Sequence, residues 1–414
     1  MTFLLLLLIL CSSVSLAFED RFPRPEFQTT YQLPKHIEAE PSIFREPIFG
    51  LTLLLLTMVA GTVALYRSRQ RNMVRAVSIF TLVFLGFLKA GCVCPIGSIQ
   101  NIAAAIFNSA VPLSVILVIV FFLPLLGALY FGRVFCGSAC PLGALQDLFV
   151  LYPKKVPSYA DRSLRILPYI YFAFAILFAV NGLGFIICRY DPFIAVFRLS
   201  GDWLQWILAF VFLVIGLFVA RPYCRYLCPY SVLLRWFSRF SQRKVQIPED
   251  HCVNCHLCHE ACPFGAIAPP RPKKYSEDKE TGLWRLRWLI ALLPGIVALG
   301  IVAGTFLTEH LASLNREVKV TKLLARGENQ QDEVSAFLIN DGDVKALHNR
   351  VSTFRRRLKF SCGLVGGFIA LTLLFAAIDV SRRRQNETYE VLEEFCLACG
   401  RCYEFCPRNS KELT

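Results

Sequence analysis

The chain reads CVNCHLCHEACP at residues 252–263 and repeats the same cysteine spacing as CLACGRCYEFCP at residues 396–407. This C-x2-C-x2-C-x3-C-P spacing is typical of bacterial ferredoxins, in which three close thiolates hold a [4Fe–4S] cluster and the fourth cysteine ligates the other cluster. A zinc site is the alternative, but zinc sites do not require the C-x3-C-P ending. The two runs therefore predict two [4Fe–4S] clusters held by eight cysteines: Cys252, Cys255, Cys258, Cys262, Cys396, Cys399, Cys402 and Cys406.

We expect the two runs to exchange their fourth ligands. Cys406 would complete the first set and Cys262 the second, which requires both runs to lie on the same side of any membrane. The segments that carry them, 242–286 and 385–414, are each too short to fold alone. They are therefore expected to form one small ferredoxin-like unit, to whose folding metal binding contributes.

The rest of the chain has the composition of a membrane protein. It is 55% hydrophobic, and its mean hydropathy is +0.50. Apolar runs of about 18 residues or more can cross a bilayer as helices. They predict an all-α polytopic membrane protein with about seven transmembrane helices, five of them in a bundle at 48–241. The expected spans lie near 48–66, 73–91, 111–131, 166–187, 203–220, 287–307 and 359–380.

The N-terminus predicts a secretory signal. Residues 1–17 have an apolar centre and a small-residue ending, although the basic start of such signals is absent, so an uncleaved helix is the alternative. Residues 18–47 would then form a periplasmic tail.

Basic residues predict the orientation, because cytoplasmic loops are enriched in Lys and Arg. With a cleaved signal, the basic segments 67–75, 133–165 and 221–286 all fall in the cytoplasm, whereas the outer loop 92–110 has no Lys or Arg. Both ferredoxin runs are then cytoplasmic in a bacterial inner membrane, and 308–358 is a periplasmic helical loop.

A second set of cysteines recurs at the inner ends of spans. CGSACPLGALQD at 136–147 and CRYLCPYSVLLRW at 224–236 both contain C-x3-C-P. Four thiolates from two such pairs would satisfy an iron–sulfur centre or one iron or zinc ion; small buried residues are the alternative. The predicted ligands of this additional iron or iron–sulfur centre are Cys136, Cys140, Cys224 and Cys228.

A looser counterpart occurs on the outer side, where GCVCPIGSIQN at 91–101 is similar to the first of these motifs. Grouping the remaining cysteines in fours predicts an outer-face metal site. Disulfides and unrelated buried thiols compete with this interpretation. The predicted set is Cys92, Cys94, Cys188 and Cys362.

The paired C-x3-C-P motifs, the two ferredoxin runs and RYDPFIAVFR at 189–198 together resemble the NosR/NapH-type membrane-bound polyferredoxins, over roughly residues 75–265 and 390–408. The resemblance implies electron transfer from a quinol or cytoplasmic donor to a periplasmic process, with a flavoprotein or metalloreductase as partner. Two features depart from the family. Residues 18–47 are too few for the flavin-binding periplasmic domain of NosR-like members, and two spans separate the ferredoxin runs.

The sequence thus predicts a membrane electron-transfer protein. It is expected to be a component of an oxidoreductase system without catalytic residues of its own, and nothing in it indicates nucleic-acid binding. One alternative is a membrane reductase that assists the maturation of a metalloenzyme. A redox sensor is another, although no output domain is visible.

Overall fold

The computed structural model describes residues 46–91, 94–108, 112–247, 252–270, 279–327, 332–340, 342–381 and 388–407. The predicted signal at 1–17 and nearly all of the predicted tail lie outside these residues.

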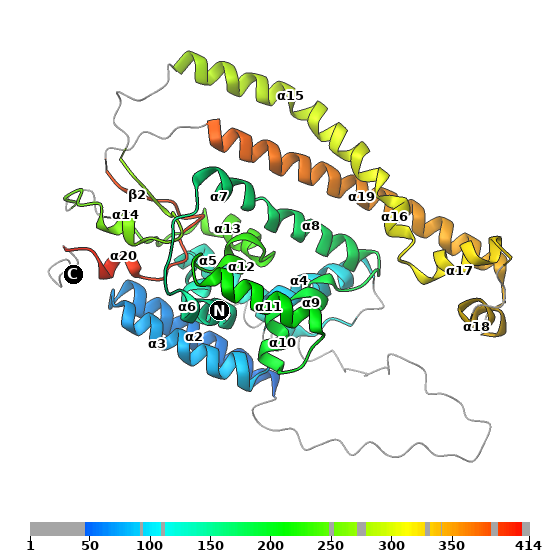
Figure 1. Cartoon of the computed structure of the whole chain (residues 1–414), viewed down its shortest axis with the longest axis horizontal. Helices are drawn as coiled ribbons and strands as arrows, with labels where there is room; N and C mark the ends of the chain where they lie inside the picture. Colours follow the sequence, from blue (N-terminus) through cyan, green and yellow to red (C-terminus); the bar gives the residue numbers. More distant parts are fainter. Residues whose placement is uncertain are drawn as a thin grey trace, which may run out of the picture.

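The described residues form a helical protein with one two-stranded sheet (Figure 1). The first half of the chain contains α2 (Pro47–Tyr66), α3 (Arg71–Thr81), π-helix η2 (Leu82–Leu88), α4 (Pro95–Phe107), α5 (Val115–Phe131), π-helix η3 (Phe135–Ala139), α6 (Pro141–Phe149), α7 (Ser158–Leu164), α8 (Leu167–Val180), α9 (Ile186–Tyr190) and α10 (Pro192–Arg198). The second half contains α11 (Trp203–Gly216), α12 (Pro222–Tyr226), α13 (Tyr230–Ser238), α14 (Leu257–Ala261), β1 (Ile267–Ala268), α15 (Lys279–Phe306), α16 (Thr308–Ala312), α17 (Arg316–Ala325), α18 (Asp332–Asn340), α19 (Val344–Ser381), β2 (Glu390–Val391) and α20 (Arg401–Glu404).

Five helical segments in the described part of the chain are long and apolar enough to cross a membrane. They are Pro47–Tyr66, Arg71–Leu88, Tyr159–Val180, Gly282–Ala312 and Val344–Ile378. The other two of the seven expected spans are shorter helices: α5 has 17 residues and α11 has 14. Helix α5 ends at Phe131 and is followed by Gly132, whose φ is +66°; α11 is joined to α10 through a bend of 103°. The count is therefore five, or six if the bent pair is one span.

Proline sets the start of several helices around the core. Helices α4, α6 and α10 each begin with Pro at the first position, where the missing N–H is not needed. The residue before each proline is extended, and these three residues are Cys94, Cys140 and Asp191. The chain thereby places a potential metal ligand at the start of each helix.

The long helices α15 and α19 lie side by side along one edge of the molecule (Figure 1). Glycines let their backbones approach: a Cβ at Gly366 would overlap the carbonyl oxygen of Gly300 and would lie 2.9 Å from the Cα of Gly304. Small residues spaced in this way are typical of helix pairs in membranes.

We predict that Gly366→Ile lowers the stability of the α15–α19 pair by about 1–3 kcal/mol, because the added side chain must push the backbones apart. Thermal unfolding in detergent measures the loss. Gly295→Ile on α15 is the matched control, since nothing lies within 4 Å of its Cβ position. Equal destabilisation by both variants would contradict the close-packing argument.

Candidate metal centres

The two ferredoxin segments form one unit, as the sequence predicted. Strands β1 and β2 pair antiparallel, with Ile267 opposite Val391 and Ala268 opposite Glu390, and α14 packs on α20. The strand pair thus joins segments that are separated in the sequence by the whole α15–α19 region.

The two cysteine loops share one backbone conformation. Asn254 and His256 flank the second cysteine of the first run with φ of 51° and 65°; Ala398 and Gly400 flank that of the second run with φ of 52° and 73°. Left-handed residues at such positions turn successive backbone N–H groups toward one side, where they can face an anion. Both loops therefore suit an anionic iron–sulfur cluster.

The cysteines of the unit fall into two groups. Cys258 lies within electrostatic range of Cys252, Cys255 and Cys406. Cys262 lies within range of three of the four second-run cysteines, Cys396, Cys399 and Cys402; the last of these is also within range of Cys258. This is the grouping that the expected exchange of fourth ligands requires, and iron ligation by these eight residues stays a prediction.

The surroundings of the thiols fit bound clusters. Burial raises the pKa of the Cys396 thiol to about 12, so a thiolate there needs a cation, and metal binding supplies one. No three His, Cys, Asp or Glu side chains in the described ranges converge on a point that could hold a single metal ion.

The ferredoxin unit docks on arginines of the helical bundle. Arg133 donates to the carbonyl oxygen of Glu394 (3.1 Å), Arg165 to that of Phe264 (3.1 Å) and Arg225 to that of Pro263 (2.9 Å). The Arg165 guanidinium also lies 3.5 Å from the centre of the Phe395 ring. These carbonyls belong to residues next to, or two positions from, Cys262 and Cys396, so the arginines place positive charge near the second group of cysteines.

The loop between Cys136 and Cys140 touches the second ferredoxin loop directly. A Cβ at Gly137 would lie 2.6 Å from the carbonyl oxygens of both Leu397 and Ala398. Only glycine therefore allows the two backbones to meet at this distance.

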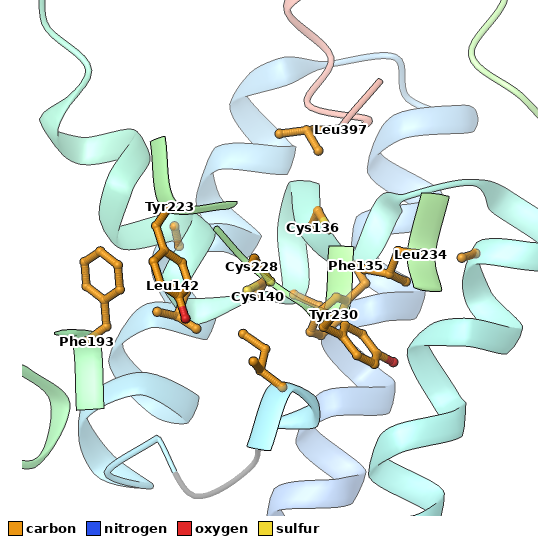
Figure 2. Close-up of a cluster of buried hydrophobic side chains, with 14 of the residues drawn as sticks. Phe135, Cys136, Cys140, Leu142, Phe193, Tyr223, Cys228, Tyr230, Leu234 and Leu397 are labelled. Atoms are coloured by element: carbon orange, nitrogen blue, oxygen red, sulfur yellow. The ribbon is translucent and has the colours of Figure 1, made fainter. Parts of the chain in front are cut away.

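The structure brings the inner-face cysteines together. All four are buried, and Cys140 lies within electrostatic range of the other three. Figure 2 shows Cys140 beside Cys228, with Cys136 nearby. Polar groups reach two of the sulfurs: Gln146 Nε2 is 3.2 Å from Cys224 Sγ and Arg133 Nη2 is 3.8 Å from Cys136 Sγ. Such contacts tune a sulfur-ligated centre, and metal binding here stays a prediction.

The outer-face set is assembled only in part. Cys94 and Cys188 lie within electrostatic range of each other. Cys362 does not join them: it lies on α19 in a separate hydrophobic cluster with residues of α8, α16, α17 and α18. Cys92 lies outside the described residues. The fifteen cysteines that the structure describes are all free, so no disulfide joins any two of them.

Two residues of the inner site were not predicted from the sequence. Arg221 is fully buried; it forms an ion pair with Asp147 and donates to the carbonyl oxygen of Cys136. Gln146 is also fully buried and accepts a hydrogen bond from the Tyr223 N–H at 3.1 Å. The sequence did contain a signal for Gln146, because the similar motifs GCVCPIGSIQN and CGSACPLGALQD both have glutamine at the same position.

Comparison with known proteins identifies iron–sulfur domains. A family described as "4Fe-4S binding domain" matches residues 113–158 and 195–248, and a second family of the same description matches 245–268. The uncharacterized proteins MJ0749 and MJ0750 of Methanocaldococcus jannaschii are 34% and 32% identical, over 32% and 44% of this chain; the chain covers 52% of the first and 77% of the second.

The regulatory protein NosR of Stutzerimonas stutzeri is 26% identical over 55% of this chain, which covers 35% of NosR. The chain thus spans about half of MJ0749 and about a third of NosR. No solved structure matches.

We predict that Cys406→Ser alters the EPR signal of the same cluster as Cys255→Ser, because Cys406 lies with the first-run cysteines. Cys262→Ser should alter the signal that Cys399→Ser alters. EPR of the reduced, anaerobically purified protein distinguishes the two signals, and Cys362→Ala is the control that leaves both unchanged. The exchange is wrong if Cys406→Ser and Cys399→Ser affect one signal.

Proposed function

We infer that this chain, which belongs to the NosR/NapH-type family of membrane-bound 4Fe–4S ferredoxin-type proteins, relays electrons between a cytoplasmic or quinol donor and a periplasmic redox partner. A bound iron–sulfur cluster supplies one-electron oxidation and reduction at potentials that its surroundings set. The chain itself holds the thiolates, excludes water and fixes the order of the sites.

The single observation that carries the proposal is the contact at Gly137. It places the backbone of the inner C-x3-C-P motif directly against the second ferredoxin loop. Arg221 extends this junction, because its guanidinium contacts Asp147 and the Cys136 carbonyl and lies 6.0 Å from the Phe264 ring. The residues that would ligate the inner centre and the second cluster are therefore held in one rigid junction.

Exposure distinguishes the two ends of the proposed relay. Cys255 of the first run is exposed, and the neighbouring apolar side chains of Val253 and Leu257 are 54% and 43% exposed. Cys396 and Cys399 of the second run pack against the core of the bundle, as does Cys262. We assign the first run to electron exchange with the donor and the second run to transfer into the bundle.

The contacts of the ferredoxin unit support a cytoplasmic location. Arg71, which follows the first span, forms an ion pair with Glu404, and Arg133, Arg165 and Arg225 donate to the same unit. The basic segments that mark the cytoplasmic side thus lie at the same end of the bundle as the ferredoxin unit.

The proposal is tested in proteoliposomes with the ferredoxin unit facing outward, dithionite outside and ferricyanide enclosed. We expect the intact chain to reduce the enclosed ferricyanide, and Gly137→Ala to slow this reduction while both [4Fe–4S] signals persist. The added methyl group must displace the second ferredoxin loop, at a cost of about 1–3 kcal/mol.

Gly282→Ala is the matched control, since its Cβ position has nothing within 4 Å. Ferricyanide reduction at the rate of empty liposomes would overturn the relay. An unchanged rate in Gly137→Ala would overturn the route through the inner motif.

A further inference from the structure

The buried bundle contains one cysteine arrangement twice. Cys94 precedes α4 and Cys140 precedes α6, both with extended backbone and both followed by Pro. Glycine stands three residues after each cysteine, and glutamine six residues after it, as Gln100 and Gln146. Each helix therefore presents the same residue types at the same positions.

The two glutamines also make the same contact. Both are fully buried. The Oε1 of Gln146 accepts from the N–H of Tyr223, the residue before the cysteine of α12. The Oε1 of Gln100 accepts at 2.9 Å from the N–H of Ile187, the residue before the cysteine of α9. The glutamine of α4 thus makes the same hydrogen bond to α9 that the glutamine of α6 makes to α12.

When the comparison is continued along the chain, Asp191 corresponds in position to Cys228. The sequence around α9 is ICRYDP and that around α12 is YCRYLCP, so each C-R-Y is followed by one potential ligand and a proline. The Asp191 N–H donates to the Ile187 carbonyl at 2.8 Å, and the Cys228 N–H donates to the Tyr223 carbonyl at 2.8 Å. Asp191 therefore occupies the backbone position that Cys228 occupies in the inner site.

Asp191 lies among the outer thiols. Its side chain is 1% exposed and within electrostatic range of Cys94 and Cys188. The Cys188 sulfur is 3.5 Å from the Cβ position of Gly97, in the first turn of α4. Asp191 is buried, Cys94 is partly buried and Cys188 is exposed, so the three potential ligands lie close together where the bundle meets its surface.

The buried carboxylate lacks a compensating cation. One oxygen accepts from the N–H of Phe193 at 3.0 Å, and in the described part of the chain no basic side chain forms an ion pair with Asp191. The Tyr223 hydroxyl is buried beside Asp191 and is the side-chain donor nearest to this carboxylate. A buried charge is costly unless it is paired or ligates a metal, and ionisable groups at membrane depth mark functional sites.

We propose that Asp191, Cys94 and Cys188 ligate an iron–sulfur centre near the outer face, with a carboxylate in the place of the inner site's Cys228. This inference rests on the proposed electron-transfer function. It replaces Cys362 of the expected outer set by Asp191. Carboxylate oxygen is a harder ligand than thiolate, so the centre has different electronic properties from the inner one.

Iron and acid-labile sulfide per chain test the proposal on the full-length protein purified anaerobically in detergent. Two ferredoxin clusters account for about eight iron atoms. We expect Cys188→Ser and Asp191→Asn to lower the iron content by the same amount, and the double variant to lower it no further, because both residues serve one site. Asp191→Asn keeps an oxygen to cap α10, so the fold is retained.

Asp191→Cys should retain the iron and shift the EPR signal of the centre, since it places a thiolate at the position that corresponds to Cys228 of the inner motif. Asp202→Asn is the control: this exposed carboxylate also precedes a helix but makes no side-chain cap. Unchanged iron in Cys188→Ser and Asp191→Asn, with both ferredoxin signals present, would overturn the outer centre alone. Absence of the ferredoxin signals from the unaltered protein would instead overturn the proposed function.

Discussion

Arg221 makes the interaction on which the rest of the structure depends. Its guanidinium is fully buried, where a charge is tolerated only if it is paired and hydrogen-bonded. Asp147 of α6 and the carbonyl of Cys136 satisfy it, and Phe264 of the ferredoxin unit lies against it. Arg221 has a φ of 49°, a conformation that surrounding contacts must maintain. The inner motif, α12 and the ferredoxin unit therefore have to assemble together.

Close backbone approach is the second constraint, and glycine meets it at two places. At Gly137 it joins the bundle to the ferredoxin unit, and at Gly366 it joins α15 to α19. The two contacts explain how a chain can place two long helices between the halves of a ferredoxin unit. The helix pair forms its own packed layer, and the strands β1 and β2 bring the two segments back together.

The sequence predicted the parts whose signal is local. The cysteine spacing implied two equivalent loops, and composition implied a membrane bundle. About seven spans were expected, and five or six helical segments in the described residues are long enough to cross a membrane. Hydropathy measures apolar residues and not the length of unbroken helix: α5 has 17 residues, and a bend precedes α11. The outer set was grouped by counting cysteines, which selected Cys362. A carboxylate carries no such signal, and only the parallel between ICRYDP and YCRYLCP indicates Asp191.

Successive spans run in opposite directions, so motifs that follow alternate spans gather at the same face. Cys94 and Cys188 meet in this way, as do Cys140 and Cys224. The hydrocarbon core is about 30 Å thick, which would separate sites confined to the two surfaces. The ring of Tyr223 of the inner motif packs edge-on against Phe193 of the outer motif, with centroids 5.3 Å apart (Figure 2). One aromatic contact therefore connects the two arrangements.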